Sequence, residues 1–139
     1  MKRSTVFAIL GCLSMFGCGG GSSGGNDGGG GGNGGAGTSS GLSRTATVKS
    51  LSSAQAATLC DWQSAKQGGY GRSVNCADGS MQTTDPDKAT CVSAVSVVGG
   101  LCPTLTVGDI EDCANASKTD LCSFDTQAGC ANLRACIGP

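Results

Sequence analysis

The sequence predicts a small, mainly α-helical domain of about four short helices, cross-linked by disulfide bonds, over residues 45–139. Leu, Ile, Val and Phe account for only 16 of these 95 residues, which is too few for an ordinary hydrophobic core. The same segment contains eight cysteines, and four stretches of it place apolar residues at helical spacing. Because one disulfide typically contributes about 2–4 kcal/mol to stability, four bridges would compensate for the missing core.

A first helix is expected to follow Ser52, because Ser52 and Gln55 have the spacing of a capping box. The glycine pair Gly68-Gly69 is expected to end this helix. One face of the helix then carries Ala56, Leu59, Cys60 and Gln63. This face is expected to contribute to the core.

A short β-hairpin is expected next, with Ser73–Cys76 and Ser80–Thr84 flanking the turn residues Ala77-Asp78-Gly79. A second helix is expected to start at Asp85-Pro86, as an N-cap followed by proline at the first helical position, and to stop at Gly99-Gly100. Its apolar face would carry Cys91, Ala94, Val95 and Val98, although its valines would also suit a strand.

The third helix has the clearest signal, since Thr106 and Asp109 form a cap-like pair. Its apolar stripe consists of Val107, Ile110, Cys113 and Ala114. The last helix is expected to begin near Asp125 and to end at Gly138-Pro139. Its apolar side carries Cys130, Leu133 and Ile137.

The eight cysteines of the domain are expected to form four disulfides, in any of 105 pairings. They are Cys60, Cys76, Cys91, Cys102, Cys113, Cys122, Cys130 and Cys136. Four of them fall on the apolar faces of the expected helices, where bridges between helices, or to the loop cysteines, would replace core contacts. Zinc binding favours close cysteine pairs and histidine, but the nearest cysteines of the domain, Cys130 and Cys136, have five residues between them and histidine is absent, so no metal site is expected.

The N-terminal residues have the order of a secretory signal: the cationic start Met1-Lys2-Arg3, then the apolar run from Thr5 to Phe16. Met15-Phe16-Gly17-Cys18 closes the run and resembles the lipobox of small, cysteine-rich bacterial lipoproteins. The resemblance implies a signal peptide over residues 1–17 and acylation, with palmitate-type chains, of Cys18. In this family a residue other than Asp after the cysteine implies the outer membrane, and here that residue is Gly19.

Two alternatives to this anchor follow from the same residues. Cys12 also follows a lipobox-like sequence, but cleavage there would leave too short an apolar run for a signal peptide. An ordinary signal peptide cut nearby would leave Cys18 as an odd thiol.

A glycine-rich spacer is expected to connect the anchor to the domain over residues 18–44. Of the 23 residues from Gly19 to Gly41, 14 are glycine, and most of the others are Ser, Asn or Thr. Such a segment is expected to be a disordered coil with a root-mean-square reach of roughly 25–30 Å. No phosphate-binding or calcium-binding pattern accompanies these glycines.

The sequence offers few candidates for catalysis, and no catalytic residue or cofactor is expected. Without histidine the chain lacks the usual imidazole base. Asp109, Glu111 and Asp112 crowd one segment, but helix N-terminal charges explain them better than an acid–base pair does. Trp62 beside Asp61 would suit a ligand platform, although a lone tryptophan is more typical of a core.

We therefore expect a non-enzymatic lipoprotein with a structural or recognition role in the cell envelope. Exposed loops, such as Gly68–Arg72 and Pro103–Thr106, would carry its specificity for a protein or glycan partner. The alternative is a small module that inhibits or binds an exported hydrolase. Loss of the signal peptide leaves seven basic and ten acidic residues, which argues against nucleic acid as a partner.

Overall fold

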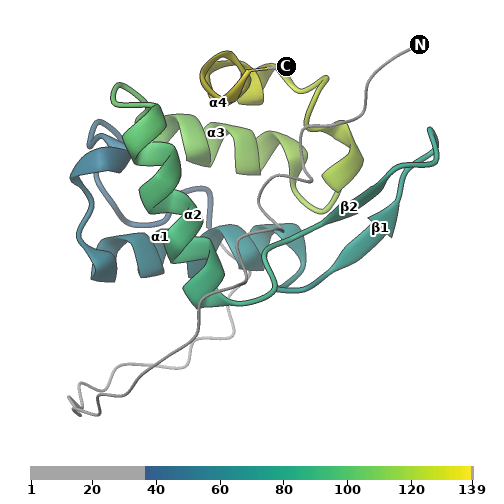
Figure 1. Cartoon of the computed structure of the whole chain (residues 1–139), viewed down its shortest axis with the longest axis horizontal. Helices are drawn as coiled ribbons and strands as arrows, with labels where there is room; N and C mark the ends of the chain where they lie inside the picture. The colour runs from purple at the N-terminus through teal and green to yellow at the C-terminus, as the bar shows by residue number, and fades with distance from the viewer. Residues whose placement is uncertain (1–36, 139) are drawn as a thin grey trace. The chain divides into compact units, whose positions relative to one another are not determined.

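A computed structural model describes residues 37–138 (Figure 1). The predicted signal peptide over residues 1–17, the acylation site Cys18, its rival Cys12 and most of the spacer lie outside the described residues. The described part contains four α-helices, a two-stranded hairpin and four disulfides, which confirms the predicted fold class. No helix in this part of the chain is both long and apolar enough to span a membrane.

Helix α1 spans Ser53–Gln67 and has the boundaries that its caps predict. The Ser52 side chain accepts the N–H of Gln55 at 3.3 Å, and the Gln55 side chain accepts the N–H of Ser52 at 2.9 Å. Gly68 ends the helix in the left-handed conformation, with φ of 90°, which glycine adopts without steric cost.

The hairpin pairs β1 (Ser73–Asn75) with β2 (Met81–Thr83) in antiparallel register. Val74 lies opposite Gln82. A hydrogen bond from the N–H of Cys76 to the carbonyl of Ser80, at 2.8 Å, closes the turn. The two strands extend away from the helical part of the domain (Figure 1).

Helix α2 spans Lys88–Leu101, so both of its predicted ends are wrong. Its N-cap is Asp87, which accepts the N–H of Thr90 at 2.8 Å, and Pro86 precedes the helix. Asp85 instead accepts the N–H of Gly71 through its carbonyl at 2.8 Å, which ties it to the segment that leads into the hairpin. The segment with the valines is a helix, not a strand.

Glycine does not end α2, because Gly99 serves close packing within the helix. A Cβ at this position would lie 2.9 Å from the backbone of Lys49, in the short 3-10 helix η1 (Val48–Ser50). The absent side chain therefore lets η1 lie directly against α2.

Helix α3 spans Val107–Ser117 and begins with the predicted capping box of Thr106 and Asp109. The last helix, α4, covers only Ala131–Ile137, so the predicted start near Asp125 is wrong. The preceding residues form two 3-10 helices, η2 (Leu121–Ser123) and η3 (Ala128–Cys130).

The close approach of η3 to α3 explains why the α-helix starts late. A Cβ on Gly129 would lie 2.6 Å from the carbonyl oxygen of Asp112, so this glycine packs against the α3 backbone. Cys130 therefore lies in η3, just ahead of α4, and not on the face of an α-helix.

The core lies where α1, α3 and the end of α2 meet, and it is small. Its main buried side chains are Val48, Leu59, Trp62, Leu105, Val107 and Ile110. Disulfides extend it: Cys60–Cys91 joins α1 to α2, Cys113–Cys130 joins α3 to η3, Cys102–Cys136 joins the end of α2 to α4, and Cys76–Cys122 joins the hairpin to η2. The bridges thus connect every α-helix and the hairpin into one covalent network.

Candidate functional site

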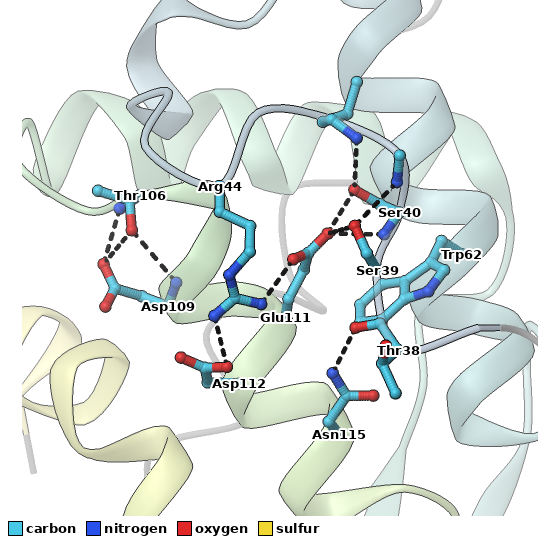
Figure 2. A network of polar contacts seen from close by, with 12 residues as sticks. Thr38, Ser39, Ser40, Arg44, Trp62, Thr106, Asp109, Glu111, Asp112 and Asn115 are labelled. Carbon is cyan, nitrogen blue, oxygen red and sulfur yellow. Dashed lines mark hydrogen bonds and ion pairs between the residues drawn. The ribbon is translucent and has the colours of Figure 1, made fainter.

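The most extensive polar network in the described residues surrounds Glu111 on α3 (Figure 2). The Glu111 side chain is completely buried, yet it carries a carboxylate. Its Oε1 accepts the N–H of Ser40 at 2.6 Å, the hydroxyl of Ser40 at 2.7 Å and the hydroxyl of Ser39 at 3.1 Å. Its Oε2 accepts Nη1 of Arg44 at 2.9 Å. Both oxygens are therefore satisfied by the segment that enters the domain.

Arg44 connects this segment to α3 at two further points. Its Nη2 donates to Oδ1 of Asp112 at 2.7 Å, on the exposed side of the network. Its carbonyl accepts the N–H of Gly108 at 2.9 Å, and a Cβ on Gly108 would lie 3.0 Å from that oxygen. The small residue at the start of α3 thus allows the entering chain to lie against the helix.

Two side chains from the helices hold the first described residues. Nε1 of Trp62 donates to the carbonyl of Gly37 at 2.8 Å, and Nδ2 of Asn115 donates to the carbonyl of Thr38 at 2.7 Å. Trp62 is only 8 % exposed and belongs to the core, so it does not form the open ligand platform that its sequence context allowed. We call residues 37–44, with these contacts, the docked segment.

The surroundings of Glu111 favour its ionised form. Burial by itself raises the pKa of Glu111, but the hydrogen bonds from Ser40 and Ser39 and the positive charge of Arg44 outweigh it, so that the pKa lies below its ordinary value of 4.5. Asp109 behaves similarly: burial raises its pKa, while hydrogen bonds from Asn132 and Thr106 lower it more. Hydrogen-bond donors therefore favour the ionised form of both Glu111 and Asp109.

The sequence offers three carboxylates as sources of an acid–base pair, and each of them has a separate structural role. Asp109 caps α3, Glu111 binds the docked segment, and Asp112 pairs with Arg44. Among residues 37–138, no group of three His, Cys, Asp or Glu side chains is placed to hold a metal ion.

The docked segment also corrects the predicted boundary between spacer and domain. The glycines and serines of residues 37–44 predict that they belong to the disordered spacer, but their hydrogen bonds to α1 and α3 make them part of the domain. The sequence contains a signal for this: Thr38-Ser39-Ser40 interrupts the glycine run, and Arg44 is the first basic residue after Arg3. Neither feature changes the average composition of residues 18–44, which is dominated by glycine and therefore predicts a coil.

The two loops expected to carry specificity differ in their exposure. In the first, Arg72 is engaged through Nη1, which donates to the carbonyls of Gln67 and Thr119 at 2.7 Å each. In the second, Leu105 is buried and its carbonyl accepts the N–H of Val48 at 2.8 Å. The expectation that Pro103–Thr106 is an exposed recognition loop is therefore wrong for its second half.

Comparison of this chain with protein-family models, with curated proteins and with solved structures finds no match.

Proposed function

We propose that this chain is an exported lipoprotein anchored through an acylated Cys18, whose helical domain has a non-enzymatic structural or recognition role at the outer membrane or cell surface. A small domain with four disulfides fits an exported protein, since such bridges persist in oxidising compartments. The anchor, and the choice of membrane, come from the resemblance of residues 1–18 to lipoprotein signals.

The docked segment is the single observation that best supports an anchored domain. Any load on a tether over residues 18–36 would reach the domain through the docked segment, and a buried carboxylate holds this segment. Bonds to an ionised group are roughly twice as strong as neutral ones, and the Glu111 carboxylate accepts four of them. A glycine- and serine-rich segment without such contacts would fray from the domain, because it has little to bury.

The composition of residues 19–36 is consistent with this arrangement. A coil of this kind would hold the domain roughly 25 Å from its attachment point. The domain would then meet partners at the membrane surface. Its docked segment would determine where on the domain the spacer is attached.

Cys18→Ser tests the anchor in cells that export the full chain. We expect the variant to move from the membrane fraction to the soluble fraction, because acyl chains contribute about 0.8 kcal/mol per buried methylene and one cysteine would carry several. Cys12→Ser is the matched control, since Cys12 follows the rival lipobox, and this variant should stay in the membrane. Mass spectrometry of the wild-type N-terminal peptide should show the acyl groups. Unchanged membrane association of Cys18→Ser would refute acylation at this residue.

A further inference from the structure

The four disulfides divide the described residues into two parts. Each disulfide closes a loop, and the four loops span residues 60–91, 76–122, 102–136 and 113–130. Because these loops overlap, residues 60–136 form one continuous cross-linked body. Residues 37–59 precede the first of these cysteines, so they are joined to the body by their own backbone at Cys60 and are held against it by non-covalent contacts.

Residues 37–51, which we call the strap, consist of the docked segment, η1 and the residues beside η1. The strap ends at Ser52, which forms the capping box of α1 with Gln55. This capping box uses no group from the strap. Helix α1 therefore keeps its start when the strap is removed.

The strap contributes little to the apolar core. Val48 is its one buried residue, and the other buried members of the core cluster begin at Leu59 in α1. Leu42, Ala46 and Leu51 are only partly buried. Opening of the strap would exchange its polar contacts for hydrogen bonds to water and expose few apolar groups, whereas unfolding of the body would expose the whole core. Opening should therefore cost less free energy than unfolding.

Consecutive hydrogen bonds join the strap to the start of α3. The N–H groups of Val48, Val107 and Gly108 each form one across this junction, at 2.8–2.9 Å, and we call these three the junction amides. Their acceptors are the carbonyls of Leu105, Ala46 and Arg44, respectively. Because the bonds follow one another along both segments, the loss of one removes the alignment of the next.

We propose that the strap opens and closes as a unit while the cross-linked body stays folded. Opening uncovers the Glu111 carboxylate and the N–H groups of Val107 and Gly108, which the strap binds in the closed state. It also adds residues 37–51 to the spacer, which lengthens the fully extended span of the spacer by about 50 Å. A load on the spacer would favour this longer state, a consequence that rests on the proposed anchor.

Hydrogen exchange followed by NMR tests the proposal on the chain from residue 18 with Cys18→Ser, so the result does not depend on acylation. Val107 and Gly108 are the first two residues of α3 and have no acceptor within the helix, so their protection reports the strap alone. The junction amides should share one protection factor, at least about tenfold below that of the Cys60 and Cys113 amides in the body. Their opening should also depend more weakly on urea, because it exposes less surface.

Two substitutions separate the strap from the body. Arg44→Ala removes the contacts of the strap with Glu111 and Asp112 and should lower the protection of the junction amides at least about tenfold. Leu133→Ala, in α4, weakens the body in the closed and the open state alike. It should therefore lower the protection of the Cys113 amide and leave the junction amides unchanged.

The proposal is refuted if the junction amides have the same protection and urea dependence as the body amides, because the strap would then open only when the whole domain unfolds. An equal loss of protection at both sets of amides in Leu133→Ala would lead to the same conclusion, as would unchanged junction amides in Arg44→Ala. Each of these results would leave the proposed anchor intact, since membrane fractionation of Cys18→Ser measures the anchor separately.

Discussion

The backbone N–H of Ser40 donates to Oε1 of Glu111 across 2.6 Å, linking two residues that are 71 positions apart in the chain. A buried carboxylate on α3 therefore anchors the segment through which the chain enters its domain (Figure 2). Loss of this one side chain should release that segment, and the release has measurable consequences.

Glu111→Gln should destabilise the domain by about 2–4 kcal/mol, because it leaves Arg44 without its buried partner and Ser40 with a weaker acceptor. Denaturant unfolding measures this loss, and hydrogen exchange should show faster exchange at the Ser40 amide. Asp112→Asn is the matched control: it removes the exposed partner of the same arginine and should cost less than about 1 kcal/mol. Equal stability of the two variants would show that burial of Glu111 has no special role.

The stability that Glu111 contributes should depend on pH. Its pKa is lower in the folded protein than its ordinary value of 4.5, so the folded state binds fewer protons than the unfolded state in this range. The contribution is complete above pH 4.5 and is lost as the pH falls through the folded pKa. The stability difference between wild type and Glu111→Gln, measured by denaturant unfolding, should therefore shrink on acidification below pH 4.5. A difference that is constant with pH would contradict this account.

Tyr70 should titrate unusually late. Burial first, and then the charge of Asp61 and its hydrogen bond at 3.2 Å, raise the pKa of Tyr70 to about 12. Tyr70 is the only tyrosine of the chain, so its absorbance change reports this pKa directly in a rapid pH-jump measurement. Asp61→Asn should bring the pKa closer to 10. Because the neutral phenol is favoured in the folded state, the associated stability should be intact below pH 10 and decline as the pH rises toward 12.

Gly99→Ala should destabilise the domain by about 1–3 kcal/mol, because its Cβ would lie 2.9 Å from the backbone of Lys49. Gly100→Ala is its neighbour in the same helix, with open space around the new methyl group, and it should stabilise the helix by up to about 1 kcal/mol. Thermal unfolding of the two variants measures both effects. Opposite signs are expected from substitutions one residue apart, and the same sign in both would contradict the packing of η1 on α2.

The Cys76–Cys122 bridge should be the first to open in mild reductant. Cys122 is exposed and Cys76 is half-buried, whereas Cys60, Cys91, Cys113 and Cys130 are buried. Access of the attacking thiolate limits the rate of disulfide exchange, so exposure should order the bridges. Timed alkylation followed by peptide mapping should recover labelled Cys76 and Cys122 first. It should also establish all four pairings, and early labelling of Cys60 or Cys113 would contradict the order.

The sequence predicts a helix end correctly where residues close in sequence determine that end. The capping boxes at Ser52 and Thr106 lie where they were expected, because a capping bond joins residues only three apart. The predicted ends of α2 and the start of α4 were wrong because distant contacts decide them. Gly99 and Gly129, which resemble helix breakers in sequence, are sites where another backbone approaches.

By itself, the sequence determined that this protein is a helical domain whose cysteines compensate for a sparse core, since composition and residue spacing are properties of the chain alone. Only the tertiary structure decided which of the 105 pairings of eight cysteines occurs, and that residues 37–44 belong to the domain. Both depend on groups distant in sequence that meet only after folding. The donors to Glu111 are about 70 residues away in the sequence, so the pattern of neighbouring residues cannot predict them.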